Sequence, residues 1–198
     1  GDGPEAVVDG LHAAAKLDYR DNATKVCTLI ADAPPHGLGR SGDGFPNGCP
    51  CGLDPITVCR NMAEKGITLY CVGCEPKITP YKSFFMALAA ITGGQYCPMQ
   101  NSKTLATAVV STVREEICLE GLMDEVRHKV EATEGMSEED QTRLVKEALK
   151  MKGVRSRQTK ADVALPTMTA DAVAMSKATS LADARERFKT SSSGYESS

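Results

Sequence analysis

The chain has 198 residues, of which 41% are hydrophobic and 25% are charged, and its formal net charge is −3. This length accommodates one ordinary domain and an appendage, because single domains usually contain about 100–150 residues. The slightly negative charge argues against nucleic acid as a partner, and no apolar run approaches the ~20 residues of a membrane span. We therefore expect neither nucleic-acid binding nor membrane binding.

Helix and strand patterns alternate through the first 130 residues. Apolar stripes, caps and glycines mark the helices, whereas apolar runs too short for a helix mark buried strands. In chain order we expect a helix over 4–17 capped by Asp2, a strand over 25–32, a loop rich in glycine and proline over 33–52, a helix over 54–65, a strand over 67–73, a helix over 79–93, a strand over 95–99 and a long helix over 101–130. This alternation predicts an α/β fold with a partial doubly wound, Rossmann-like parallel sheet and helices on both faces.

The composition changes near Glu131, which divides the chain into a partial α/β domain at 1–130 and a helical, partly extended tail at 131–198. The segment 137–140, Ser-Glu-Glu-Asp, is a capping signature for a helix that ends near Gly153. A second amphipathic helix follows Pro166, and its apolar stripe is formed by Val173, Ala174, Ala178, Leu181 and Phe188. These tail helices either dock into a partner or pack back on their own sheet.

Several segments occur in an order that is specific for one family. They are PEAVVDGL at 4–11, LIADAPPHG at 29–37, GDGFPNGCPCGLDP at 42–55, MAEKGITLYCVGCEP at 62–76 and LAAITGGQYCPM at 88–99. Together they resemble the C-terminal half of a von Willebrand factor A domain, of the intracellular kind found with alpha-kinase domains. The match runs from about Asp2 to Leu122 and implies that the chain carries half of this fold.

In that family a divalent ion is held at the carboxyl edge of a six-stranded sheet. Its ligands come from a D-x-S-x-S motif, a loop that bears a threonine, and an aspartate that ends the fourth strand. Asp32 matches this aspartate, and Asp2 falls near the loop, although the threonine is absent. The chain contains no D-x-S-x-S, so we expect Mg²⁺ at Asp32 and Asp2 only if that motif is supplied from outside this chain, and otherwise no cofactor. The alternative role of Asp32 is to cap the turn that follows it.

The chain contains eight cysteines, and five of them suggest a zinc site: Cys49, Cys51, Cys59, Cys71 and Cys74. Such a site is disfavoured because C-x-C is not the usual ligand spacing and because residues three apart on a strand point to opposite faces. We expect reduced thiols packed in strands and loops, which are typical of a cytoplasmic protein.

His36 follows the strand that ends at Asp32 and has the chemistry of a metal ligand or a base. A histidine beside two prolines is more typical of a residue that orders a loop by hydrogen bonding, and we favour that role. No nucleophile with a nearby histidine and acid is recognisable, and no G-x-x-x-x-G-K-[ST] motif occurs. We therefore expect no enzymatic activity.

The family's first three strands have no counterpart in the chain, so one edge of the expected sheet lacks a neighbour. An unpaired edge promotes aggregation unless upstream sequence or another chain covers it. We expect a non-catalytic protein–protein interaction or structural module in a larger cytoplasmic assembly, with other proteins covering the sheet edge and the tail helices. The alternatives are a fragment of an alpha-kinase-associated protein and a cation-dependent adhesion-type domain.

Overall fold

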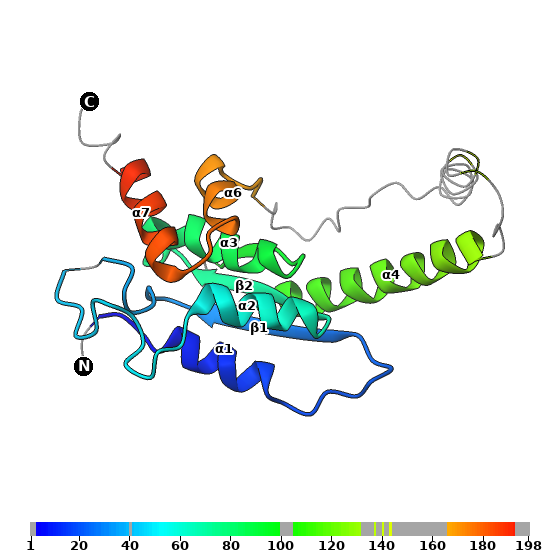
Figure 1. The fold of residues 1–198 in the computed structure, drawn as a ribbon, viewed down its shortest axis with the longest axis horizontal. Helices are drawn as coiled ribbons and strands as arrows, with labels where there is room; N and C mark the ends of the chain where they lie inside the picture. Colours follow the sequence, from blue (N-terminus) through cyan, green and yellow to red (C-terminus); the bar gives the residue numbers. More distant parts are fainter. Residues whose placement is uncertain are drawn as a thin grey trace.

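The computed structural model describes residues 3–39, 41–99, 105–131, 137, 140, 143 and 166–192. Three parallel strands form one sheet in the order β1 (Lys25–Ala31), β2 (Ile67–Cys74) and β3 (Tyr96–Met99), as Figure 1 shows. The predicted α/β fold, a partial Rossmann-like parallel sheet with a helical tail, is confirmed. Asp2, the expected cap of the long helix at 101–102 and the helix expected over 144–153 lie outside the described residues.

The helices are α1 (Val7–Ala15), α2 (Pro55–Glu64), α3 (Lys82–Ile91), α4 (Leu105–Glu131), α6 (Ala170–Ser176) and α7 (Leu181–Ser192), and a 3-10 turn, η1 (Thr79–Tyr81), precedes α3. In the described part of the chain, no helix combines the length and the apolar character needed to cross a bilayer. Helix α4 starts beside the sheet and then runs away from it (Figure 1).

The two faces of the sheet differ in what covers them. Ile67, Leu69 and Cys71 of β2 belong to the main hydrophobic core, together with residues of α1, α2 and α3. The intervening side chains of β2 point to the opposite face, because side chains alternate along a strand. There the hydroxyls of Thr68 and Tyr70 donate hydrogen bonds of 2.8 and 3.1 Å to Glu116 of α4. Helices therefore lie on both faces, as the alternating sequence pattern predicts.

Asp54 starts α2 as expected, because its carboxylate accepts the backbone N–H groups of Ile56 and Thr57 at 2.9 and 3.2 Å. Gly94 follows α3 at a point where no side chain fits. A Cβ at this position would lie 2.0 Å from the carbonyl oxygen of Leu69. The glycine therefore allows the end of α3 to approach β2 closely.

Two helices begin later than the sequence predicts. The first starts at Val7 rather than at residue 4, because Glu5 pairs with Pro35 and its backbone N–H donates to the carbonyl of Pro34 at 2.9 Å. This pairing holds the chain before α1 in an extended conformation. The segment expected to open the third helix forms η1 instead, so α3 itself starts at Lys82.

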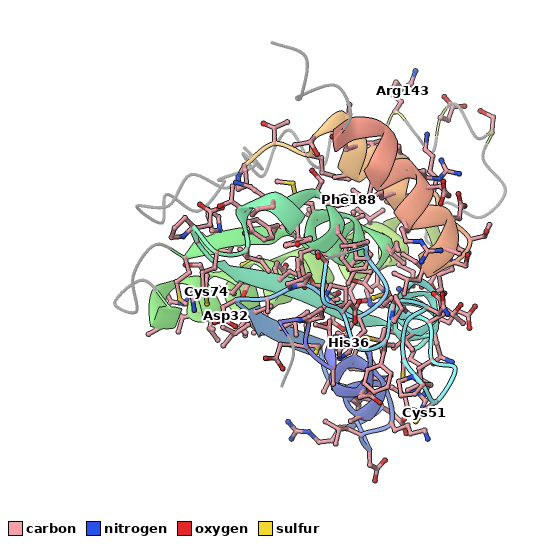
Figure 2. All side chains as sticks on the ribbon, turned by 90° about the vertical axis from the view of Figure 1, so that its left-hand side faces the viewer. Asp32, His36, Cys51, Cys74, Arg143 and Phe188 are labelled. Atoms are coloured by element: carbon pink, nitrogen blue, oxygen red, sulfur yellow. The ribbon has the colours of Figure 1, made fainter. Side chains whose placement is uncertain are left out.

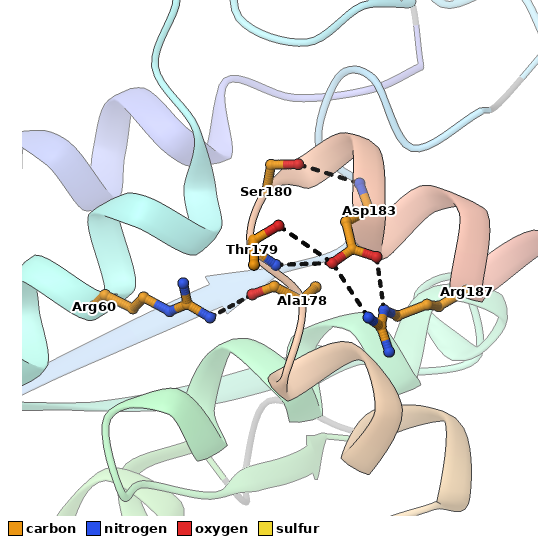
Figure 3. Close-up of polar contacts among 6 residues, drawn as sticks. All are labelled: Arg60, Ala178, Thr179, Ser180, Asp183 and Arg187. Atoms are coloured by element: carbon orange, nitrogen blue, oxygen red, sulfur yellow. Dashed lines mark hydrogen bonds and ion pairs between the residues drawn. The ribbon is translucent and has the colours of Figure 1, made fainter.

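The helices α6 and α7 pack back on the body of the protein and do not project from it. The core residues of these helices and of the segment between them are Ala172, Met175, Ala178, Leu181 and Ala184. The predicted apolar stripe is wrong at Val173, which is 40% exposed. The reason is a break in the helix at 177–180, where the side chain of Asp183 accepts the backbone N–H of Thr179 at 2.9 Å and the hydroxyl of Ser180 accepts the N–H of Asp183 at 3.2 Å (Figure 3). Because of this break, the buried face of α7 is turned relative to that of α6.

Polar contacts with α2, its cap and the long loop hold this C-terminal pair of helices in place. Arg60 donates to the carbonyl of Ala178 (Figure 3), and the second carboxylate oxygen of Asp54 accepts the N–H of Leu181 at 2.6 Å. Arg185 donates to the carbonyl of Pro46 at 3.0 Å. The start of α7 is therefore held by polar contacts as well as by apolar packing.

Of the capping signature at 137–140, the structure describes Ser137 and Asp140. The hydroxyl of Ser137 accepts the backbone N–H of Asp140 at 3.2 Å and donates to its carboxylate at 2.9 Å. This geometry confirms the predicted cap.

Candidate functional site

The carboxyl ends of β1 and β2 carry the residue that the family resemblance selects. Asp32 follows β1 directly, is exposed, and places a carboxylate oxygen 3.4 Å from the ammonium group of Lys77. Both side chains are more than half exposed, and pairs of this kind contribute little to stability. A cation at Asp32 would have to displace Lys77. Since Asp2 lies outside the described residues, the two-aspartate metal site stays a prediction.

Cys74 ends β2 close to Asp32, and Figure 2 shows both residues at the same edge of the sheet. Burial raises the pKa of the Cys74 thiol, the negative charge of Asp32 raises it further, and Lys77 opposes the increase. A thiol with a raised pKa is a weak nucleophile at neutral pH, because the thiolate is the reactive form.

A second polar group at this edge ties β2, α3 and β3 together. The ammonium group of Lys82 lies 3.2 Å from a carboxylate oxygen of Glu75 and 5.4 Å from the ring centroid of Tyr96. The hydroxyl of Tyr96 donates to the same oxygen of Glu75 at 3.4 Å. Burial raises the pKa of Tyr96, and the charge of Glu75 raises it further. The charges and hydrogen-bonding groups of these three side chains are paired with one another, which indicates a structural role.

The outer edge of β1 is the most open part of the sheet. Nearly all of β2 is buried, whereas every residue of β1 is at least partly exposed, and Ile30 is 48% exposed. Among the described residues, β2 is the one strand that pairs with β1. A groove of about 330 Å³ runs beside β1, between residues 29–33 and the segment that leads into α1, with Glu5, Val7 and Gly10 on its other wall.

His36 orders the long loop, as the sequence predicts. Its Nδ1 lies 2.7 Å from a carboxylate oxygen of Asp43, and this carboxylate also accepts the backbone N–H groups of Gly37 and Phe45 at 2.8 and 2.9 Å. Burial alone would raise the pKa of Asp43, but the hydrogen bonds from His36 and the two backbone groups lower it below its usual value. The ring of Phe45 meets the His36 ring edge-on at 5.0 Å.

All eight cysteines are free thiols, and those proposed as zinc ligands lie in different places. Cys59 and Cys71 are buried in the core, where burial raises the pKa of Cys59 to about 12 and that of Cys71 well above its usual value. Cys74 lies at the end of β2. Cys49 and Cys51 lie in the long loop, and a different residue, Asp9, joins them.

Asp9 was not predicted as a site residue. It belongs to α1 and lies 40 residues before Cys49 in the sequence, yet both of its carboxylate oxygens are 3.7 Å from the Cys49 sulfur. The pKa of Cys51 is raised, mainly by the charge of Cys49 and by a hydrogen bond with it. Desolvation and the negative charge of Asp9 raise this pKa further. No sequence motif links a helix aspartate to a distant C-x-C pair, so only the fold reveals this cluster.

Comparisons of the chain with protein-family models, with curated proteins and with solved structures give no match. The resemblance to the von Willebrand factor A domain therefore depends on the motifs alone.

Proposed function

We propose that the chain is a non-catalytic interaction module whose sheet is completed by an extended strand of another protein, added along the outer edge of β1. The observation that carries the proposal is the exposure of β1. This strand has a single paired neighbour among the described residues, and a groove lies beside its last residues, 29–31. Added strands bind such edges through main-chain hydrogen bonds, and side-chain pockets supply specificity.

The composition of β1 supports this role. Natural edge strands usually carry inward-pointing charges, prolines or bulges that prevent pairing with other chains. After Lys25, the sequence of β1 is Val-Cys-Thr-Leu-Ile-Ala, with no charge and no proline. A strand of this composition is typical of the interior of a sheet and requires a neighbour on each side.

The family resemblance indicates what kind of strand the partner supplies. By the resemblance, β1 matches the family's fourth strand, and in the usual doubly wound strand order, 3-2-1-4-5-6, the fourth strand neighbours the first in a parallel arrangement. We infer that the partner supplies an apolar parallel strand and that the assembly is intracellular, because free thiols in this number are typical of reducing compartments. The groove lined by residues 29–33 then holds alternate side chains of the incoming strand.

Co-expression with the N-terminal half of a von Willebrand factor A domain of the alpha-kinase-associated kind tests the proposal. We expect a one-to-one complex in which the backbone amides of β1 become protected from hydrogen exchange. Ile30→Lys should abolish the complex, because it places a charge in the strand interface. Val173→Lys is the matched control, since Val173 has similar exposure, 40% against 48%, but lies on α6.

Three results would contradict the proposal. One is a complex that forms without protection of the β1 amides. Another is a chain that stays monomeric and folds cooperatively while it binds neither this half-domain nor a second copy of itself at high concentration. Equal loss of binding in Ile30→Lys and Val173→Lys would likewise exclude β1 as the interface.

A further inference from the structure

Two thiols and a carboxylate meet between α1 and the long loop. They belong to Asp9, Cys49 and Cys51, and one donor atom from each residue lies within 4.8 Å of the other two. Asp9 and Cys51 are exposed, and Cys49 is partly buried. The cluster is therefore reachable from solvent and needs no opening of the core.

Both sides of the cluster are held firmly in place. Val8 and Leu11 flank Asp9 on α1 and are 6% and 1% exposed, which fixes this helix on the core. On the loop side, the N–H of Gly52 donates to the carbonyl of Cys49 at 2.9 Å and closes a tight turn. A prearranged ligand set loses little conformational entropy when an ion binds.

The sulfur of Cys49 also has a backbone partner of its own. The N–H of Cys51 points to it with a nitrogen–sulfur distance of 3.4 Å. Contacts of this type orient metal ligands and tune them, and they accompany most metal sites in proteins. The turn therefore presents both sulfurs to the side on which Asp9 lies.

We propose that Asp9, Cys49 and Cys51 bind a zinc ion. Thiolates are soft ligands that select zinc over Mg²⁺ and Ca²⁺, and a carboxylate oxygen is a common additional ligand. Three protein ligands of a tetrahedral ion leave a fourth position for water, which the exposure of Asp9 and Cys51 permits. On binding, each thiol loses its proton to the solvent and forms a zinc–sulfur bond.

The bound ion would link α1 to the loop that contacts α7. Gly48 lies directly before Cys49, and a Cβ at Gly48 would be 3.0 Å from the side chain of Leu181. Zinc at the cluster therefore stabilises the loop against which the C-terminal helices pack. It does so independently of any strand added to β1.

Cobalt titration of the full chain under reducing conditions tests the proposal, because Co²⁺ replaces zinc and reports its ligands by absorption. We expect one ion per chain, with thiolate-to-cobalt charge-transfer absorption and the intense visible bands of a tetrahedral ion. Zinc should then displace the cobalt. Cys49→Ser and Cys51→Ser should each reduce the charge-transfer absorption by at least half, and Asp9→Asn should weaken binding by about tenfold or more.

Cys118→Ser is the matched control, because Cys118 is an exposed thiol on α4. It should bind cobalt like the unchanged chain. Zinc should also raise the melting temperature of the control but not that of Cys51→Ser, since ligands that bind the folded state stabilise it. Because Asp9 and Cys51 are exposed, their variants should keep the circular dichroism spectrum of the folded protein.

The proposal is overturned if cobalt shows only the weak spectrum of an octahedral ion. It is equally overturned if the charge-transfer absorption is undiminished in Cys49→Ser and Cys51→Ser, or if Cys118→Ser removes it. None of these results bears on strand addition at β1.

Discussion

Helix α3 and strand β1 are both apolar, but the chain covers one and leaves the other open. Six consecutive residues of α3, from Phe84 to Ala89, are at most 3% exposed, because the sheet lies on one side and α6 on the other. In β1, by contrast, every residue is at least partly exposed. The C-terminal helices therefore cover α3, whereas the apolar strand β1 stays partly open among the described residues.

Substitution of Met175 of α6 should strongly destabilise the side of the sheet that the C-terminal helices cover. Met175 is fully buried against the core, so Met175→Ala should lower the free energy of unfolding by about 2–5 kcal/mol. Chemical denaturation measures this loss. Met168→Ala is the control, because Met168 is 40% exposed and should change stability by less than about 0.5 kcal/mol. Equal effects of the two changes would mean that α6 does not pack on α3.

Asp54 contacts the first residues of two helices. One carboxylate oxygen accepts N–H groups of α2, and the other accepts the N–H of Leu181 at the start of α7. Asp54→Ala should therefore lower the free energy of unfolding by about 2 kcal/mol, from a lost cap and an unsatisfied donor. Asp54→Asn keeps one side-chain oxygen and should cost clearly less. If the two variants were equally unstable, the charge rather than the hydrogen bonds would be responsible.

Asp43 in the long loop should make the stability of the protein depend on pH. Its pKa in the folded protein is lowered, so its contribution is complete above the pKa of the unfolded chain, about 4, and is lost as the pH falls through the lower folded value. Asp43→Asn should flatten the dependence of unfolding free energy on pH in that acidic range. Denaturation at several pH values measures the slope. An unchanged slope in the variant would assign the acid sensitivity to other carboxylates.

Ile30 on the open side should behave in the opposite way to Met175. Because Ile30 is 48% exposed, Ile30→Lys should change the unfolding free energy by no more than about 0.5 kcal/mol, although it should prevent strand addition. The measurement is denaturation of the isolated chain. A loss as large as that of Met175→Ala would show that the edge of β1 is covered by this chain itself.

Magnesium should have the smallest effect. Asp32 is paired with Lys77, so millimolar Mg²⁺ should leave the melting temperature of the chain unchanged. Asp32→Asn provides the control, since it removes the candidate ligand. An increase in the melting temperature that disappears in Asp32→Asn would restore the cation-dependent site.

Most of the α/β body could be predicted from local patterns. The three strands, the cap at Asp54 and the loop role of His36 follow from short apolar runs and turn chemistry, and the structure confirms them. The later start of α1 could not be predicted, because it depends on the pairing of Glu5 with Pro35, 30 residues away. The break between α6 and α7 could not be predicted either. The apolar pattern is continuous there, but hydrogen bonds of Thr179 and Ser180 with Asp183 end one helix and start the next.

The sequence by itself determined the order of the elements, the parallel sheet and the position of Asp32 at the end of a strand, because these depend on the properties of neighbouring residues. Only the tertiary structure decided which apolar surface the tail covers and which stays open. It also brought Asp9 to Cys49, which no spacing could indicate. Contacts between distant segments depend on packing in three dimensions, and the periodicity of a single segment carries no record of its partner.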